Sequence, residues 1–476
     1  MWSIRKWPET VIFSTESSDG ITMAPRREAI IGGAEGERWG DDMEQLLLEM
    51  GPDDGDNLLQ EAVRWGNVLE AYRRVKQNKG APGPDGMTVE ALGELLRSRW
   101  PEIQASLESG TYRPQPVRRV EIPKDGGGKR KLGIPCVLDR FVQQMLLQVL
   151  APLFDPRFSK WSYGFRRGRG TQDAVLRARA HVKDGFRWTV DLDLEKFFDR
   201  VNHDVLMARV ARRVKDKRVL RLIRQFLKVG CLEGGLASPK LEGTPQGGPL
   251  SPLLSNILLD DLDKELETRK LRFVRYADDL NIYVKSKRAA ERVLLSVTRF
   301  LREKLRLGVN EKKSKVDRPW KRVFLGYTMT PHHNPKLRVA PEKEKRLKTK
   351  FRALLRQGRG SSIASTLPKL SVKIRGWVAY YRLCDVKAAF DRLDGWMRRR
   401  VRALLWRHWK NPKTRRRELM RRGIDEGRAS ISAFNGRGPW WNAGASHMNQ
   451  AIKIRQLQHA GLLSFQEEFQ RLKRCR

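Results

Sequence analysis

The sequence predicts an α+β protein, in which a middle part with an antiparallel sheet is followed by a helical and strongly basic part. Apolar and polar residues alternate at 188–194, which indicates a half-buried strand with carboxylates on its polar face. A second pair of strands is predicted around 271–284, and apolar residues recur at helical spacing between the strands and beyond about residue 340. This order of segments favours an α+β fold over a doubly wound parallel sheet.

Each element follows from its own pattern. A helix is predicted from Leu58 through Tyr72, and it must end before the Gly- and Pro-rich segment 80–86. Residues 112–134 indicate a β-hairpin with basic arms and a glycine-rich tip. Further helices are expected at 136–153, 203–228, 250–269 and 288–306, and two apolar stripes at 347–355 and 393–409 predict basic helices.

The charge of the chain indicates a polyanionic partner. Lys and Arg number 96 against 55 Asp and Glu, a formal net charge of +41, and such self-repulsion is relieved by nucleic acid or by an anionic membrane. The sequence shows no apolar run near the roughly 20 residues that span a bilayer. It also begins without the pattern of a secretory signal. We therefore expect nucleic acid, no membrane, and a cytoplasmic protein that associates with the nucleoid when it binds DNA.

The two ends differ in chemistry. Residues 1–55 hold 5 basic and 12 acidic side chains, and we expect a largely disordered acidic extension there. Residues 341–476 hold 34 basic and 10 acidic side chains, so this region carries over half of the excess charge. The four cysteines are far apart and form no paired motif, which argues against a disulfide framework or a zinc site.

Three aspartates are candidates for metal chemistry. Asp278 and Asp279 form an adjacent pair in a tight turn between two strands, and such carboxylates repel each other unless cations hold them. With a third carboxylate from a neighbouring strand, Asp191 or Asp193, they would form a cage for two Mg²⁺ ions that clamps a phosphoryl transfer. Taken alone, the pair could equally be an ordinary hairpin turn, where Asp is common.

Five motifs in order resemble those of reverse transcriptases. They lie at 190–199 around Asp193, at 243–252 with its Pro-Gln-Gly segment, at 276–279 with Tyr-Ala-Asp-Asp, at 307–314 and at 324–327. Segments 78–86, 122–124, 132–135 and 139–140 are similar to the fingers of group II intron-encoded enzymes, and 375–381 resembles their maturase region. The resemblance runs from about residue 56 to the end. Within this family the sequence is most similar to the compact bacterial class C members, which lack an HNH endonuclease domain.

The resemblance implies roles for individual residues. It selects Asp193 over Asp191 as the third metal ligand, beside Asp278 and Asp279, and makes Asp199 a supporting carboxylate. Phe198 would lie under the incoming sugar and clash with a ribose 2′-OH, with a purely core role as the alternative. Lys313 would protonate the pyrophosphate leaving group, with a solvated lysine as the alternative.

The resemblance also implies nucleotide contacts. Lys124 and Arg130, and more weakly Arg118, would neutralise the triphosphate from the basic hairpin, which could otherwise be merely solvated. Gln246 would contact the nucleotide sugar or the template backbone. The arginines at 398, 399, 400 and 402 would grip RNA, while interleaved tryptophans anchor their helix in a core, so that neutralising these arginines should leave folding intact.

Together these features imply a right-hand polymerase with Mg²⁺ as cofactor and Mn²⁺ as an alternative. The expected domains are the extension 1–55, fingers and palm 56–335, a thumb and maturase domain 336–420, and a basic DNA-binding region 421–476. The implied partners are intron RNA, an RNA template, primer and target DNA, and deoxynucleoside triphosphates. Two alternatives stay open: a domesticated reverse transcriptase in phage defence or DNA repair, and a splicing factor with an inactive polymerase, against which the three intact carboxylates argue.

Overall fold

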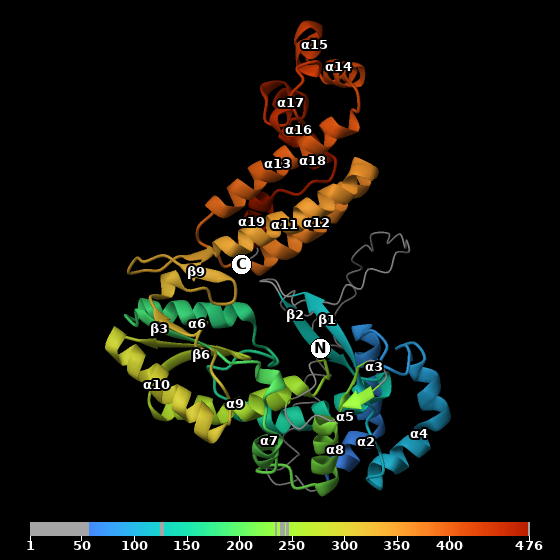
Figure 1. The fold of residues 1–476 in the computed structure, drawn as a ribbon, viewed down its shortest axis with the longest axis vertical. Coiled ribbons are helices and arrows are strands. Elements are labelled where there is room, and N and C mark those ends of the chain that lie inside the picture. The colour runs from blue at the N-terminus through green and yellow to red at the C-terminus, as the bar shows by residue number, and fades with distance from the viewer. Residues whose placement is uncertain (1–56, 124–127, 234–235, 239–242, 244–246, 475–476) are drawn as a thin grey trace. The chain divides into compact units, whose positions relative to one another are not determined.

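The chain folds into two compact units. This computed structural model describes residues 57–123, 128–233, 236–238, 243 and 247–474. One unit comprises residues up to Ala178 together with Phe186–Asp317, and the other comprises Arg179–Gly185 and Arg318–Arg476 (Figure 1). The division after Asp317 falls before residue 335, where we expected the palm to end, and the second unit contains both segments that we separated at residue 420.

The first unit contains two sheets. Its strands are β1 (Val117–Pro123), β2 (Lys129–Ile134), β3 (Trp188–Asp193), β4 (Cys231–Glu233), β5 (Leu236–Ser238), β6 (Arg272–Tyr276), β7 (Asp279–Val284) and β8 (Lys315–Asp317). The central sheet has the order β6-β7-β3-β8 with every neighbouring pair antiparallel. The second sheet has the order β2-β1-β4-β5, in which β1–β2 and β4–β5 are antiparallel and β1–β4 is parallel.

Helices surround these sheets. They are α2 (Leu58–Val63), α3 (Trp65–Asn78), α4 (Leu92–Glu108), α5 (Val137–Phe154), α6 (Thr171–Lys183), α7 (His203–Val210), α8 (Lys217–Lys228), α9 (Ser251–Thr268) and α10 (Lys287–Lys304), with short 3₁₀ turns η2 (Asp155–Arg157) and η3 (Phe197–Asp199). Helix α10 packs against β3 and β7, and α9 against β6. Val190 and Leu192 of β3 are buried in this core, so the predicted apolar face of that strand is confirmed.

Two predicted helices are interrupted. The helix expected from Leu58 to Tyr72 breaks at Arg64, whose backbone leaves the helical region, and the Asn67 amide donates to the carbonyl of Ala62 at 2.7 Å. The helix expected at 203–228 stops after α7 and restarts at Asp216, whose carboxylate accepts from the backbone of Leu59 at 3.0 Å and from that of Arg218 at 2.9 Å. Side-chain capping therefore ends and restarts helices that periodicity alone continues.

The second unit is mainly helical. It contains η4 (Pro319–Lys321), the antiparallel pair β9 (Tyr327–Met329) and β10 (Leu337–Val339), η5 (Gly358–Gly360), and helices α11 (Pro341–Gln357), α12 (Ile363–Tyr380), α13 (Ala388–His408), α14 (Pro412–Met420), α15 (Glu426–Ala433), α16 (Pro439–Asn442), α17 (Ser446–Ala451), α18 (Ile454–His459) and α19 (Phe465–Arg474). The core joins α12, α13 and α19, because Phe469 stacks on Phe390 at 4.2 Å and Phe465 lies 5.7 Å from Trp377. Residues beyond 420 thus share one core with the helices before them.

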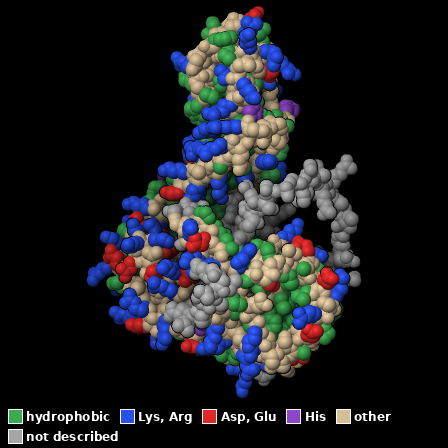
Figure 2. Space-filling view, turned by 45° about the vertical axis from the view of Figure 1, so that its right-hand side comes forward, with side chains coloured by type: hydrophobic (Ala, Val, Ile, Leu, Met, Phe, Trp, Pro, Cys, Tyr) green, Lys and Arg blue, Asp and Glu red, His purple; other side chains and the backbone are tan. Residues whose placement is uncertain are grey.

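The surface of the second unit is basic, as its composition requires. Figure 2 shows Lys and Arg side chains over this unit with few acidic ones among them. Within the part of the chain that the structure describes, no helix is both long and apolar enough to cross a membrane.

Candidate active site

The three candidate metal ligands lie at one end of the central sheet. Asp193 is the last residue of β3 and pairs directly with Asp279, the first residue of β7. Directly opposed residues of antiparallel strands project from the same face, with Cβ atoms about 4.5–5.5 Å apart. Asp278 precedes Asp279 in the turn that joins β6 to β7. Asp191 lies two residues back along the same face, opposite Asn281, and is therefore farther from the turn.

The turn that carries Asp278 has an uncommon backbone. Tyr276 pairs with Asp279, which leaves Ala277 and Asp278 as the two loop residues, and Ala277 has a φ of +56°. A non-glycine residue with positive φ is costly, and the surrounding structure has to hold it. Gly164 packs directly against it, since a Cβ atom on residue 164 would lie only 2.2 Å from the backbone nitrogen of Ala277.

Buried polar side chains hold this turn from beneath. Arg275, 1% exposed, donates to the carbonyl of Ala277 at 3.0 Å and forms an ion pair with the fully buried Asp263 at 2.6 Å. It also donates to Asn256 at 2.9 Å, and the Asn256 amide in turn donates to the carbonyl of Gly164 at 2.9 Å. Sequence reasoning missed this network, because an arginine in a basic chain gives no sign of being buried. The only available signal was its place in a strand directly before the Tyr-Ala-Asp-Asp turn.

The segment at 307–314 supports Asp193. The backbone nitrogen of Asn310 donates to the carbonyl of Asp193 at 2.9 Å, and the nitrogen of Asp193 donates to the Ser314 hydroxyl at 3.0 Å. The ammonium of Lys313 lies 3.4 Å from a carboxylate oxygen of Asp193 and is 68% exposed. The structure therefore brings Lys313 to the aspartates, as expected if it acts beside them.

The donor chemistry of this group suits a hard divalent cation, since carboxylate oxygens are the ligands that Mg²⁺ prefers. Within the described residues, however, no group of three His, Cys, Asp or Glu side chains is gathered closely enough to hold a metal ion. Lys313 supplies a positive charge next to Asp193. The two-ion site on Asp193, Asp278 and Asp279 thus stays a prediction.

Phe198 and Phe197 occupy different environments. Phe197 is 3% exposed within the core, while Phe198 is only half-buried and meets Phe197 edge to face at 5.2 Å. Both belong to η3, which follows Lys196, a residue with a φ of +46°. This turn carries the chain from the end of β3 and leaves part of the Phe198 ring accessible. Asp199, the last residue of η3, is exposed.

The predicted nucleotide contacts are only partly described. Lys124 and Gln246 lie outside the described residues, and of Arg130 the structure describes the backbone, which pairs with Ile122 in the hairpin. Arg118 pairs with Ile134 on the same hairpin, and its buried Nε atom has no hydrogen-bond partner within the described residues. The hairpin itself forms as predicted.

Near the hairpin lies a buried carboxyl for which sequence reasoning found no role. Asp139 is 2% exposed and accepts hydrogen bonds from the Tyr112 hydroxyl at 2.7 Å and from the backbone of Gln115 at 3.1 Å. Burial raises the pKa of Asp139 to about 6, against the lowering effect of these hydrogen bonds. Asp139 therefore ties α5 to the start of the hairpin.

Helix α13 corrects one expectation about the basic side chains. Arg402 is 8% exposed, and its guanidinium donates twice to the carbonyl of Ile452, at 3.1 and 2.8 Å. Arg399 donates twice to the carbonyl of Trp440, at 3.2 and 3.1 Å. The expectation that neutralising all four arginines leaves folding intact is therefore wrong for Arg402, which connects α13 to the chain after α17. Of the three tryptophans expected to anchor this helix, Trp406 and Trp409 are buried, whereas Trp396 is only half-buried.

Two family models match the chain. Residues 122–329 match the reverse transcriptase (RNA-dependent DNA polymerase) family, and residues 344–423 match the group II intron maturase-specific domain. Protein YkfC of Escherichia coli is 34% identical over 289 residues, which cover 52% of this chain and 76% of that protein. The chain belongs to the group II intron-type reverse transcriptases.

Other relatives of this group II intron-type reverse transcriptase agree. The group II intron-encoded protein LtrA of Lactococcus lactis is 37% identical over 206 residues, 43% of this chain but only 34% of LtrA, so the match spans about a third of that relative. The putative COX1/OXI3 intron 1 protein of Saccharomyces cerevisiae is 31% identical over 233 residues, which cover 49% of this chain and 26% of that protein. Among solved structures, telomerase from Candida tropicalis aligns over 62% of each chain with a TM-score of 0.38 and 15% identity, too low to support a functional argument.

Proposed function

We propose that this reverse transcriptase copies an RNA template into DNA and acts as the maturase of a group II intron. The observation that carries the proposal is the direct pairing of Asp193 with Asp279 beside Asp278, within a matched reverse transcriptase domain that a maturase-specific domain follows. In the reaction, the 3′-OH of a DNA primer attacks a deoxynucleoside triphosphate that is paired with the template.

In this proposal Asp193, Asp278 and Asp279 hold two Mg²⁺ ions, with Mn²⁺ as an alternative. When bound, such ions neutralise phosphate charge and activate the attacking and leaving oxygens. The turn at Ala277, against which Gly164 packs, keeps two of these carboxylates at the end of β7.

Other side chains of the chain act on the nucleotide. In this proposal the ammonium of Lys313 delivers a proton to the departing pyrophosphate, and its contact with Asp193 at 3.4 Å supports that role. The half-buried Phe198 ring excludes a ribose 2′-OH. By resemblance, Lys124, Arg130 and Arg118 neutralise the triphosphate, and Gln246 contacts the sugar or the template.

The maturase role is assigned to the basic second unit and the fingers. Intron RNA would bind through guanidinium and ammonium groups on the helices beyond residue 340, with a steep dependence on salt concentration. The basic segment 421–476 would contribute to binding of target DNA. In both roles the partner is a polyanion, and the excess positive charge of this region favours binding of a polyanion.

A primer-extension assay tests the polymerase. Purified full-length protein is given an annealed RNA template and DNA primer, deoxynucleoside triphosphates, and Mg²⁺ or EDTA, with Asp278→Asn as the inactive control. We expect template-directed extension only with Mg²⁺ and the intact aspartate. A parallel assay follows splicing of a group II intron RNA with and without the protein. No extension under any condition would refute the polymerase role, and extension that survives both EDTA and Asp278→Asn would refute the assignment of catalysis to these aspartates.

A further inference from the structure

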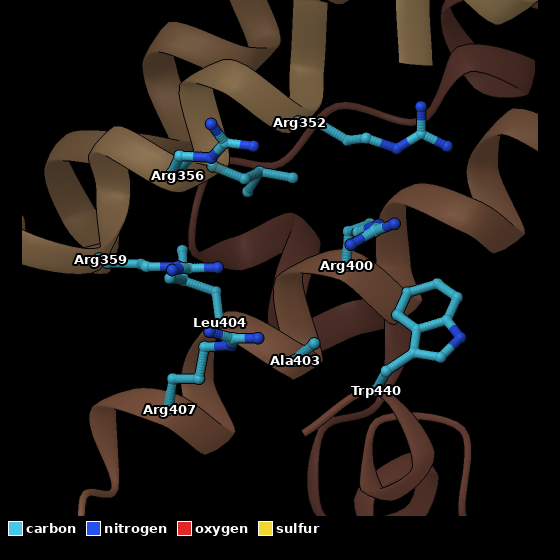
Figure 3. A pocket seen from close by; sticks show the side chains of 9 residues that line it. Arg352, Arg356, Arg359, Arg400, Ala403, Leu404, Arg407 and Trp440 are labelled. Atoms are coloured by element: carbon cyan, nitrogen blue, oxygen red, sulfur yellow. The ribbon is translucent and has the colours of Figure 1, made fainter. Parts of the chain in front are cut away.

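A cavity in the second unit is surrounded by arginines. It has a volume of about 140 Å³ and lies between α11, η5, α13 and the short helix α16. Figure 3 shows side chains from these elements arranged around one common space. The cavity is lined by Leu355, Ala403 and Leu404 and by six further side chains: Arg352, Arg356, Arg359, Arg400, Arg407 and Trp440. Leu355 and Leu404, 7% and 3% exposed, form its apolar floor.

The charge of this cavity is uncompensated. Its nine lining residues include five arginines and no acidic side chain. Among the described residues, none of the five arginines forms an ion pair with Asp or Glu. The first turns of α11 contrast with this, because Glu344 there pairs with Lys348 and with Arg392. Five neighbouring guanidinium groups repel one another, and an anion within the cavity would relieve that repulsion.

Arg400 carries the clearest sign of a missing ligand. Its Nε atom is buried and finds no acceptor within the described part of the chain. A buried donor without a partner is destabilising, because it has lost its hydrogen bonds to water and gained none in return. Burial, and then the charges of Arg352 and Arg407, lower the pKa of Arg400.

Aromatic rings stack on the guanidinium groups and orient them without occupying their N–H hydrogen-bond donors. Arg400 stacks on Trp440 at 4.4 Å and lies 5.5 Å from Trp396, and Arg352 lies 5.8 Å from the same Trp396 ring. Stacking engages the face of a guanidinium and leaves its in-plane N–H groups directed outward. Such pre-oriented edges match the paired oxygens of a phosphate group. Trp440 is itself 39% exposed beside the cavity, and Arg399 also stacks on its ring, at 4.2 Å.

We propose that this cavity is a binding site for a backbone phosphate of single-stranded RNA. The proposal rests on the RNA-binding function proposed above and assigns it one defined contact. Five guanidinium groups exceed what one carboxylate would neutralise, whereas a polyanionic strand supplies further phosphates to the exposed arginines at the rim.

The test uses the full-length protein and a fluorescently labelled single-stranded RNA oligonucleotide at several salt concentrations. Arg356→Gln/Arg407→Gln removes two rim charges. Arg288→Gln/Arg292→Gln on α10 is the charge-matched control, because both of those residues are exposed and lie outside the regions assigned to RNA binding. We expect the first pair to weaken binding about tenfold. It should also lower the slope of log K against log salt by about 0.7, the value for one phosphate contact on a single strand.

A second variant separates geometry from charge. Arg400→Lys keeps the positive charge but loses the planar fork, so we expect it to weaken RNA binding, whereas a non-specific basic surface would not respond. Circular dichroism and the unfolding midpoint check that each variant is folded. If Arg400→Lys destabilises the unit, the exposed Arg356→Gln/Arg407→Gln pair alone decides whether the site exists.

The outcomes are distinct. Equal loss in the cavity pair and the control pair, or no loss in either, refutes the site while wild-type RNA binding upholds the proposed function. No RNA binding by the wild-type protein refutes the proposed RNA-binding function itself. Titration with inorganic phosphate and pyrophosphate forms a further arm. If these bind in the cavity while the cavity variants leave RNA binding unchanged, the site takes a free anion and the RNA proposal is wrong.

Discussion

The ammonium of Lys313 lies 3.4 Å from a carboxylate oxygen of Asp193, across a contact between two segments 120 positions apart in the chain. This ion pair distinguishes Lys313 from its exposed neighbour Lys312. The ion pair forms although the Lys313 side chain is 68% exposed.

Replacing Lys313 by Ala should lower the single-turnover rate of nucleotide incorporation by about 10²-fold, which is typical of losing a general acid. The affinity for the nucleotide should change little, because the proton is needed only as pyrophosphate leaves. Rapid-quench kinetics over a range of pH measure both quantities. Lys312→Ala is the matched control, and similar rates for the two variants would make Lys313 an ordinary solvated lysine.

Loss of a metal-binding carboxylate should separate the two activities. Asp193→Asn and Asp278→Asn should reduce DNA synthesis by several orders of magnitude, because each removes a predicted ligand of the catalytic ions. Both variants should still promote splicing, since the gripping of intron RNA is assigned elsewhere. Primer extension and splicing assays are run side by side.

Asp191→Asn is the control for that experiment, because Asp191 shares the strand face of Asp193 but lies opposite Asn281. It should retain synthesis within about tenfold of wild type. A reversed ranking of Asp191 and Asp193 would show that the third ligand has been assigned to the wrong residue.

Replacing Phe198 by Val should admit ribonucleotides while deoxynucleotide incorporation survives. The reason is steric, since the two substrates differ only in the 2′-OH, and the half-buried ring is the one left accessible by η3. The ratio of kcat/KM for dCTP and CTP is the measurement. Phe197→Leu, in the core, should lower stability and leave that ratio unchanged. An unaltered ratio in Phe198→Val would assign Phe198 to packing alone.

Breaking the buried pair beneath the turn should affect both folding and activity. Arg275→Met leaves Asp263 charged and unpaired, which should lower the free energy of unfolding by about 3–5 kcal/mol. The double variant Arg275→Met/Asp263→Leu no longer contains the unpaired Asp263 carboxylate, so the free energy of unfolding should largely recover. Polymerisation should stay low, because the hydrogen bond to the Ala277 carbonyl is still missing. Denaturant titration and primer extension test this, and full recovery of synthesis would reduce Arg275 to a stabilising role.

Two arginines of α13 should respond differently to the same substitution. Arg402→Gln should lower the free energy of unfolding by about 1.5–3 kcal/mol, the range for hydrogen bonds to a charged group, because the Ile452 carbonyl loses both donors. Arg398→Gln, on a half-exposed side chain, should leave stability unchanged and reduce the salt dependence of RNA binding. Thermal unfolding and binding titrations compare them. Equal stability of the two variants would contradict the structural role of Arg402.

Much of the first unit could be predicted from sequence because its signals are local. Alternation at 188–194 predicted β3, the basic arms and glycines predicted the β1–β2 hairpin, and the Tyr-Ala-Asp-Asp segment predicted the β6–β7 turn. Apolar periodicity did not reveal the break at Arg64, where the nearby Asn67 amide donates to the Ala62 carbonyl, and the break before Asp216 also depends on a group from elsewhere in the fold. The Asp216 carboxylate, for example, accepts from Leu59, 157 positions away.

The sequence by itself determined the class of fold, the order of the elements, the need for a polyanionic partner and the family to which the chain belongs. Composition, periodicity and motif spacing are properties of the residues along the chain, and they can be determined without a tertiary structure. Only the tertiary structure decided which of many similar arginines are structural and which are available to a ligand. Arg275, Arg400 and Arg402 are equivalent as sequence letters, but the first pairs with Asp263, the second has an unmatched Nε atom and the third donates to Ile452. That distinction depends on burial and on partners from other elements, which the order of residues along the chain does not reveal.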